Sequence, residues 1–269
     1  MEMEKIYSTL YTLHSSLNQP KGDLKLEIVY LLHSGFMIRD GQTLLVFDDY
    51  NDPAKVVANA VNQGDFEHLY IFASHAHFDH FDTHIRAYAD QATRYIFSYD
   101  IKRTKRVKIF PADNITFMKR YSEWQGEDIK VWTYDSTDVG VSFLVETGSG
   151  ERIFHAGDFN LWYWEGDKPE NQAMAKKVFE KQLKRMKGLE VDVAFFPIDG
   201  RLGNFQEKGV IEFIKNTEVK TLVAMHRENY PAWTPSYRFQ LETEPIPIWS
   251  PVKPGEKRFL IDNKFISRD

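Results

Sequence analysis

The chain has 269 residues, of which 42% are hydrophobic and 27% charged, and its formal net charge at pH 7 is -5. This balance argues against extensive disorder, and the interspersed charges lack the basic footprint of a typical nucleic-acid binder. The sequence contains no cysteine, which excludes disulfides, thiol nucleophiles and thiolate metal ligands. Any metal ion must therefore be held by histidine, carboxylate or water.

The first residues, MEMEKIYSTLYTLHSS, differ from a secretory signal. They carry acidic residues and lack both an apolar segment and a small-residue cleavage site. No uninterrupted apolar run in the sequence approaches the length that crosses a bilayer. We expect a cytoplasmic protein with no membrane partner.

In chain order, short apolar segments first predict three strands, LEIVYLL, FMIRD and TLLVFDD, separated by turns at Gly35 and Gly41. A helix is expected from Pro53 to about Asn62, because proline favours the first helical position. The segment HLYIFAS then predicts a strongly apolar strand. A β-meander followed by a helix and a strand is the expected beginning of the fold.

The middle of the chain is predicted to be rich in strands. Candidate strands are RYIFSY, VKIF, IKVWTY, VSFLVET and RIFHA, with TGSGE as a tight turn between the last two. Asp82 or Thr83 is a candidate N-cap for a helix that precedes them.

The second half predicts alternating helices and strands. A helix with a basic, solvated face is expected from Asn171 to Lys187, and a second one from about Gln206 to Asn216. The strands VDVAFFPI and KTLVAMH flank the second helix, and KRFLID predicts a last strand. Since no repeat or linker interrupts the pattern, we expect a single domain over residues 1–269, with its core at about 26–262.

A histidine-rich segment, FASHAHFDHFDTH, runs directly on from a predicted apolar strand. Its residues His75, His77, Asp79 and His80 carry imidazole and carboxylate groups that suit zinc, iron or manganese. The alternative is a solvent-exposed loop without a ligand. Unpaired polar groups beside a buried strand would carry a desolvation cost, which favours a metal site.

Other predicted strands also end in residues that could serve such a site. Asp48 follows LLVF, Asp158 follows RIFHAG, and His226 follows TLVAM. Taken singly, Asp48 is typical of a turn and His226 of a buried, hydrogen-bonded histidine. Their shared position just beyond β-type segments, where functional side chains tend to gather, favours a common site.

The ordered set of Asp48, HAHFDH, HAGD and His226 resembles the metallo-β-lactamase superfamily over about residues 26–230. The resemblance implies an α+β fold, an αββα sandwich in which two mixed β-sheets lie face to face with helices outside. It also implies a dinuclear metal site at one edge of the sheets.

The resemblance assigns two histidines to the first ion, three residues to the second, and a bridging aspartate to both. In that order they are His75 and His77, then Asp79, His80 and His226, then Asp158. Asp48 would brace the segment from His75 to His80, here called the histidine loop. The expected cofactor is zinc, as one or two ions, with manganese or iron as alternatives.

One motif departs from the family pattern. Members usually supply a third histidine to the first ion from a segment such as HTDGGVGF, whereas this chain has STDVGVSF, with Ser136 at that position. The first site is therefore expected to be weak, to recruit Asp135 or Asp138, or to be empty. Capping a turn is the commoner role for an aspartate such as Asp138.

The segment LLHSGFMIRDGQTLLVFDDY further resembles the branch of metal-dependent hydrolases that includes ascorbate-6-phosphate lactonase. In that branch a histidine of the first strand lies near the active site, and His33 matches its position. A purely structural role for His33 is the alternative. We expect His84 to be peripheral and His155 to be packed or to support a ligand.

The resemblance implies hydrolysis of a small ester, lactone or phosphoester by a metal-activated water, with Asp79 as the catalytic residue that positions that water or accepts its proton. Trp162 and Trp164 offer apolar walls for a ring or acyl group, or else belong to the core. Arg201 is a candidate contact for a substrate anion, although structural ion pairing is commoner for arginine.

Two alternatives remain beside hydrolysis of a small-molecule substrate. A non-catalytic metal-binding or sensor protein would explain Ser136. A nuclease is disfavoured by the negative net charge, although the predicted helix over residues 176–187 carries a concentrated basic segment. The sequence specifies neither the substrate nor the oligomeric state.

Overall fold

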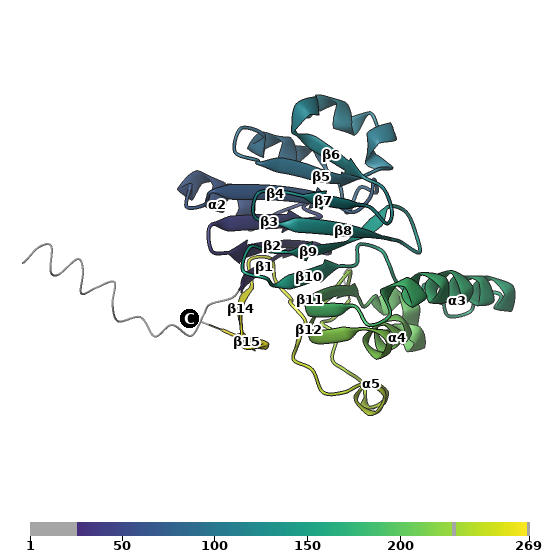
Figure 1. Ribbon diagram of the computed structural model, residues 1–269. Helices are drawn as coiled ribbons and strands as arrows, with labels where there is room; N and C mark the ends of the chain where they lie inside the picture. Colours follow the sequence, from purple (N-terminus) through teal and green to yellow (C-terminus); the bar gives the residue numbers. More distant parts are fainter. Residues whose placement is uncertain (1–25, 228–229, 268–269) are drawn as a thin grey trace, which may run out of the picture.

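Two mixed β-sheets lie face to face in the computed structural model, which describes residues 26–227 and 230–267 (Figure 1). The strands of the first sheet are β1 (Leu26–Leu32), β2 (Gly35–Asp40), β3 (Thr43–Phe47), β4 (His68–Ala73), β5 (Arg94–Ser98), β6 (Ile115–Met118), β14 (Lys257–Ile261) and β15 (Lys264–Ile266). Their order is β15-β14-β1-β2-β3-β4-β5-β6. Strands β1 to β3 pair antiparallel, whereas β3 to β6 pair parallel.

The second sheet has the order β13-β12-β11-β10-β9-β8-β7. Its strands are β7 (Glu123–Gln125), β8 (Lys130–Asp135), β9 (Val141–Glu146), β10 (Arg152–His155), β11 (Glu190–Pro197), β12 (Glu218–Met225) and β13 (Ile248–Trp249). Strands β7 to β10 pair antiparallel, and β10 to β13 pair parallel.

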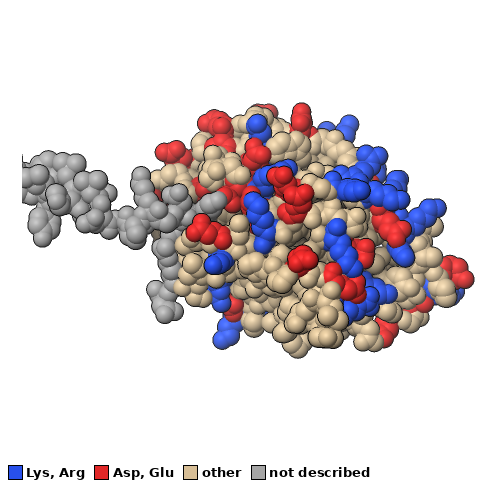
Figure 2. Space-filling model, turned by 60° about the horizontal axis from the view of Figure 1, so that its bottom comes forward, with Lys and Arg blue, Asp and Glu red and all other residues tan. Residues whose placement is uncertain are grey.

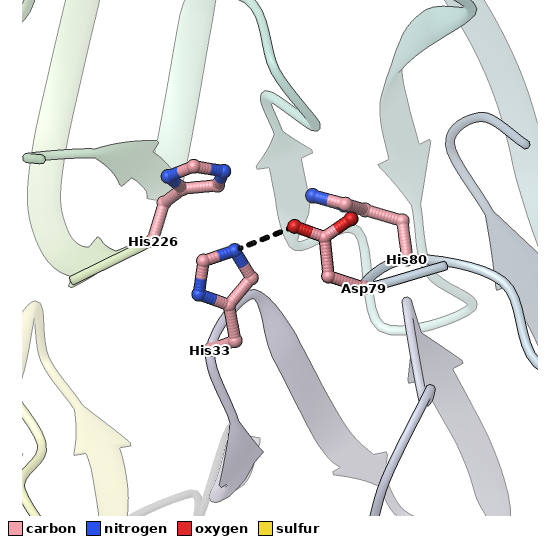
Figure 3. Close-up of side chains that lie close together, drawn as sticks. All are labelled: His33, Asp79, His80 and His226. Carbon is pink, nitrogen blue, oxygen red and sulfur yellow. Dashed lines mark ion pairs between the residues drawn. The ribbon is translucent and has the colours of Figure 1, made fainter. Parts of the chain in front are cut away.

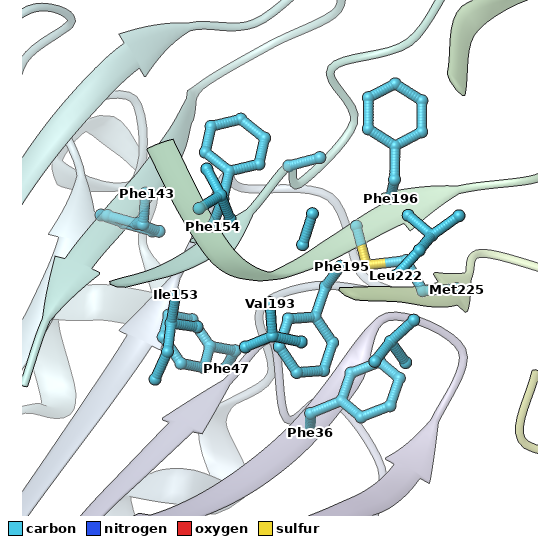
Figure 4. Close-up of a cluster of buried hydrophobic side chains, with 14 of the residues drawn as sticks. Phe36, Phe47, Phe143, Ile153, Phe154, Val193, Phe195, Phe196, Leu222 and Met225 are labelled. Atoms are coloured by element: carbon cyan, nitrogen blue, oxygen red, sulfur yellow. The ribbon is translucent and has the colours of Figure 1, made fainter. Parts of the chain in front are cut away.

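Side-chain alternation along the strands builds the core. Leu45 and Phe47 of β3 belong to the apolar cluster between the sheets, while Leu44 and Val46 belong to the cluster on the opposite face. Successive side chains of a strand point to opposite faces, so a strand that is covered on both sides reads as a continuous apolar segment. Figure 4 shows aromatic side chains of both sheets meeting between them.

Helices cover the outer faces of the sheets. They are α2 (Val56–Gln63), α3 (Pro169–Leu183), α4 (Lys208–Asn216) and α5 (Tyr237–Glu242). Phe179 and Leu183 of α3 and Phe213 of α4 pack into the same apolar cluster as the second sheet. The αββα sandwich expected from the sequence is confirmed.

Some predicted elements differ in detail. Helix α2 begins at Val56 rather than Pro53, and Asp82 caps a short 3₁₀ helix, η1 (Thr83–Tyr88), by accepting a hydrogen bond from the backbone N–H of His84. The segment VKIF is not a strand but lies largely in a 3₁₀ helix, η3 (Arg106–Ile109). The short elements β6, β7, β13, β15 and α5 were not predicted.

The reason for the error at VKIF is the spacing of its apolar residues. Val107 and Phe110 are buried, while Lys108 and Ile109 between them are exposed. A spacing of three residues places two side chains on the same face of a 3₁₀ helix, so both reach the core.

Within residues 26–227 and 230–267, no helix is long and apolar enough to cross a membrane. The segment MEMEKIYSTLYTLHSS lies outside the described residues. Figure 2 shows acidic and basic side chains interspersed on the face in view.

Candidate metal centre

The topology brings the ends of several strands together. Asp48 follows β3, and the histidine loop follows β4 in the first sheet; Asp158, Asp199 and His226 lie beyond β10, β11 and β12 in the second. Each of these two sets of strands is parallel, so its carboxyl ends lie at one edge of its sheet, where ligands usually bind in such sheets.

The first group of side chains, here called the three-histidine cluster, consists of His33, Asp79, His80 and His226. One potential ligand atom of each lies within 4.8 Å of those of the others. Figure 3 shows these four side chains converging. Nε2 of His33 lies 3.5 Å from Oδ2 of Asp79. The three imidazoles are buried and Asp79 is half-buried.

The second group, here called the two-histidine cluster, consists of His75, His77, Asp138 and Asp158, again with one potential ligand atom of each within 4.8 Å of the others. Nε2 of His75 lies 3.0 Å from Nδ1 of His77. The same Nδ1 atom lies 3.6 Å from Oδ2 of Asp138. His75 and Asp158 are buried, whereas His77 and Asp138 are exposed to the cleft beside the cluster.

Asp158 lies between the two clusters. Its Oδ1 atom is 3.1 Å from Nε2 of His80 and 3.3 Å from Nε2 of His226. Its Oδ2 atom is 3.5 Å from Nε2 of His75. One carboxylate thus presents an oxygen to each cluster, which is the arrangement required of a bridging ligand.

Asp48 holds the histidine loop from behind. Its Oδ1 atom accepts a hydrogen bond from the backbone N–H of Ser74 at 2.7 Å. Its Oδ2 atom accepts one from the hydroxyl of Ser74 at 2.6 Å and lies 2.7 Å from Nδ1 of His80. Because Asp48 is buried behind the loop, it positions His80 and does not reach the cleft.

Three imidazoles have their Nδ1 atoms occupied, which directs Nε2 to the site. Nδ1 of His80 faces Asp48, Nδ1 of His75 lies 3.0 Å from the Ser74 hydroxyl, and Nδ1 of His226 lies 3.0 Å from Oδ2 of Asp199. A partner at one ring nitrogen fixes the tautomer and leaves the lone pair of the other for a metal.

The electrostatics keep the carboxylates ionised. Burial alone would raise the pKa of Asp158, but the charges of His80 and His226 hold it well below its ordinary value. Burial would likewise raise the pKa of Asp79, yet the close contact with His33 and the charge of His80 lower it. Burial and the charge of His80 lower the pKa of His75 to about 3, so that this imidazole is neutral. The ionised carboxylates and the neutral imidazole of His75 are thus in the metal-ligating form.

Buried polar atoms test whether a metal fits. Among the described residues, Nε2 of His33, Nε2 of His80 and Oδ1 of Asp158 are buried without a hydrogen bond of acceptable geometry. Leaving such an atom unsatisfied costs about 1–3 kcal/mol, more if it is charged. All three atoms face the three-histidine cluster, where coordination to a cation would satisfy them. The donor set therefore fits a divalent metal.

The backbone around the site is unusual. His33, Asp48 and His226 have φ angles of 56°, 44° and 61°. Residues with a side chain rarely adopt this left-handed conformation, and it persists where the surrounding structure enforces it. The backbone N–H of His226 donates to the carbonyl of His33 at 3.1 Å, which joins the two sheets at the site.

Comparisons with known proteins give a partial sequence match and broader structural matches. No protein-family model matches the sequence. A UPF0173 metal-dependent hydrolase of Thermus thermophilus is 30% identical over 145 residues, which are 51% of this chain and 62% of that protein. Its counterpart in a second strain of the same species gives the same values. The chain thus spans about three fifths of the length of these relatives.

Solved structures extend the likeness to most of the chain. A metallo-hydrolase of the archaeon Ignicoccus hospitalis matches with a TM-score of 0.58 and 15% identity, over 86% of this chain and 97% of that one. The metallo-β-lactamase fold protein YhfI of Bacillus subtilis matches with a TM-score of 0.56 and 9% identity, over 87% and 98%. The chain has the metallo-β-lactamase fold.

Within this fold, Ser136 and Asp138 lie in the same turn. The hydroxyl of Ser136 accepts a hydrogen bond from the backbone N–H of Asp138 at 3.2 Å, so the serine supports the turn. The carboxylate of Asp138 lies beside His77 in the two-histidine cluster, which fits the alternative in which the first site recruits Asp138. Asp135 instead pairs with Arg120 at 3.1 Å, away from the cluster.

The other candidates also have definite positions. His33 belongs to the three-histidine cluster. His84 lies outside both clusters, with Nε2 3.2 Å from Asp49 and Nδ1 3.1 Å from Asp82. His155 is fully buried, and its ring stacks on Phe47 at a centroid distance of 5.0 Å, in keeping with a packing role.

Sequence reasoning missed several supporting residues. Asp199 orients His226, as described above, and also binds Arg201. Arg106 donates to the carbonyls of Ala76 and Phe81, and Asp100 accepts from the backbone N–H of Ala76 at 2.8 Å, so both brace the histidine loop. Only Asp199 carried a usable signal, since it follows a predicted strand as His226 does.

Proposed function

We propose that this chain is a metal-dependent hydrolase of the metallo-β-lactamase superfamily that acts on a small ester, lactone or phosphoester. The position of Asp158 carries the proposal, because its two oxygens face two separate histidine-containing clusters. Both clusters border a cleft of about 550 Å³ that is open to a small molecule. The 30% identical metal-dependent hydrolases of Thermus thermophilus support the same reaction class.

The proposed metal is zinc, with manganese or iron as alternatives, because the clusters mix imidazole with carboxylate oxygen. The three-histidine cluster would hold one ion and the two-histidine cluster a second, with Asp158 shared between them. When bound, such ions lower the pKa of a coordinated water and polarise the carbonyl or phosphoryl oxygen of a substrate.

Asp79 is the proposed acceptor of the proton released in hydrolysis. It lines the cleft, and its lowered pKa keeps it ionised at neutral pH. Its contact with His33 at 3.5 Å holds the carboxylate toward the three-histidine cluster. Nε2 of His33 would thus be either a ligand or the group that orients Asp79, because one ring nitrogen cannot do both at once.

The direct test is hydrolysis by the purified, zinc-loaded protein of p-nitrophenyl acetate, a phosphorylated lactone and bis-p-nitrophenyl phosphate. The lactone examines the resemblance to ascorbate-6-phosphate lactonase. At least one substrate should be turned over, and Asp158→Asn should reduce that rate by roughly 100-fold or more. Asp192→Asn, which changes a buried carboxylate of β11 bound to Lys220, is the matched control and should retain activity.

Failure of these assays has a defined meaning. Zinc binding without turnover of any of the three substrates would favour the non-catalytic metal-binding or sensor protein. A nuclease would require binding of RNA that weakens steeply with salt. On the face in Figure 2 the basic side chains are mixed with acidic ones.

A cytoplasmic location remains our prediction.

A further inference from the structure

The cleft beside the metal centre has two chemically different parts. His77, Asp79, Asp138, Asp158 and His226 provide its polar, metal-binding part. Phe78, Trp162 and Trp164 provide aromatic walls, together with the guanidinium of Arg201. Phe78 is 76% exposed and Trp164 37% exposed. Large apolar side chains that gather in the open beside polar groups mark a binding surface.

Trp162 is held in a fixed orientation beside the clusters. Its indole N–H donates to the carbonyl oxygen of Asp158 at 2.9 Å. Its ring meets that of His226 edge to face, with centroids 5.5 Å apart. The ring of Trp164 lies nearly parallel to it, at a centroid distance of 5.8 Å and an interplanar angle of 14°. A preorganised aromatic wall of this kind loses little side-chain entropy when a ligand binds.

Arg201 continues this wall. Its guanidinium carbon lies 5.7 Å from the ring centroid of Trp164, within the range of a cation–π contact. Nε of Arg201 donates to both carboxylate oxygens of Asp199, at 2.9 and 3.0 Å, which fixes the guanidinium. The same Asp199 holds His226, so the aromatic wall and the metal centre share one anchoring carboxylate.

We propose that the cleft binds a substrate that carries a planar aromatic ring next to the bond that is cleaved. The ring would pack against Trp162 and Trp164, while the reacting group lies over the two clusters. Flat rings make offset-stacked or edge-to-face contacts that a saturated ring of the same size cannot make. This inference rests on the proposed function for the identity of the reacting group, but the binding preference itself requires no turnover.

The test compares the affinities of two probes, 4-phenylbutyrate and 4-cyclohexylbutyrate. They are measured by isothermal titration calorimetry of the protein with and without zinc. The two acids share the carboxylate, the linker and the number of ring carbons, and only the aromatic character differs. Burial of apolar surface alone would favour the more hydrophobic cyclohexyl acid. We expect phenylbutyrate to bind more tightly by roughly 3- to 10-fold because of ring contacts.

Variants locate the preference. Trp162→Leu and Trp164→Leu each keep an apolar side chain but remove a ring, and each should reduce the preference for phenylbutyrate toward unity. Tyr237→Leu removes a 75% exposed ring from α5, outside the cleft lining, and should leave the preference unchanged. Circular dichroism verifies that each variant is folded; Trp164, which is more exposed than Trp162, provides the second variant if Trp162→Leu does not fold.

Equal or tighter binding of cyclohexylbutyrate by the wild-type protein would overturn the inference. A preference for phenylbutyrate that persists in both tryptophan variants would also overturn it. So would a failure of both acids to bind. A protein that prefers phenylbutyrate and hydrolyses no substrate would keep the aromatic site and reject the hydrolase. Hydrolysis of a substrate without a preference for phenylbutyrate would support the hydrolase and reject the aromatic site.

Discussion

Oδ2 of Asp199 lies 3.0 Å from Nδ1 of His226, while Nε2 of the same imidazole faces Asp158 at 3.3 Å. The last histidine of the metal centre is thus held between two carboxylates, one behind it and one in the site. A carboxylate behind a metal-ligating histidine fixes its tautomer and raises its basicity. Asp199 is therefore part of the metal centre although it touches no proposed ion.

Replacement of Asp199 should weaken metal binding without removing a ligand. Asp199→Asn removes the charge that orients His226, and we expect zinc affinity to fall roughly 10- to 100-fold. Competition with a chromophoric chelator measures this change. Asp192→Asn on the same strand is the control and should bind zinc as the wild type does. Unchanged zinc affinity in Asp199→Asn would show that the contact does not orient His226.

Asp199 also predicts a pH-dependent stability. Burial alone would raise the pKa of its carboxyl, but hydrogen bonds from His226 and Arg201 lower it to about 2. The unfolded pKa is about 3.9, so the stabilisation is complete above that value and is lost as the pH falls toward the folded pKa. Urea unfolding at pH 7 should show Asp199→Asn to be less stable by on the order of 2 kcal/mol.

The stability gap between wild type and Asp199→Asn should narrow when the same unfolding experiment is repeated near pH 3, because the wild-type carboxylate then begins to lose its advantage over the unfolded chain. A gap of constant size across this range would mean that Asp199 acts through packing rather than charge.

The two-histidine cluster makes a separate prediction about stoichiometry. Asp138→Asn removes a carboxylate 3.6 Å from His77. It should lower the affinity for one of the two zinc ions, because an amide is a poor substitute for a carboxylate ligand. Zinc titration should then show one tight site where the wild type shows two. Asp135→Asn, in the same segment but paired with Arg120, should keep both. Two tight sites in Asp138→Asn would exclude the carboxylate as a ligand.

Gly140 allows the close approach of the segment that carries Asp138 to the histidine loop. A Cβ atom on Gly140 would overlap the carbonyl oxygen of Ser74 and lie 2.5 Å from Cβ of His75. Gly150 also has a positive φ, 88° against 79° for Gly140, yet a Cβ there would meet nothing within 4 Å. The two glycines thus share the backbone conformation and differ in the space around them.

Gly150→Ala should therefore cost about 1 kcal/mol in the free energy of unfolding, from conformation alone. Gly140→Ala should cost roughly 3 kcal/mol or more, because the backbone of the histidine loop must also move. It should lower zinc affinity as well, which Gly150→Ala should not do. Urea unfolding measures the two stability costs, and zinc titration measures the zinc affinity of each variant. Equal costs for the two variants would contradict the close approach.

The sequence predicts those parts of the fold and the site that depend on local pattern. Strands β3, β4, β11 and β12 are recognisable because both of their faces are buried, which leaves long apolar segments. Asp158 and His226 are recognisable because each lies just past a predicted strand, β10 and β12 respectively. In both cases neighbouring residues carry enough information, and the parallel pairing of the strands brings their ends together.

The missed features depend on contacts between distant segments. The sequence left the role of Asp138 open, because its side chain faces His77 of a distant segment, from a turn in which the Ser136 hydroxyl accepts from the backbone N–H of Asp138. Arg106 braces the histidine loop from a 3₁₀ helix 30 residues away from Ala76. Short edge strands such as β7 and β13 contribute few apolar residues, so their pairing partners define them rather than their own sequence.

Native mass spectrometry of the zinc-reconstituted protein tests the dinuclear centre most directly. We predict two zinc ions per wild-type chain, and a loss of tight binding at both positions in Asp158→Asn, because this one carboxylate faces both clusters. A wild-type chain that retains no zinc, or an Asp158→Asn chain that retains two ions as tightly as the wild type, would contradict the account.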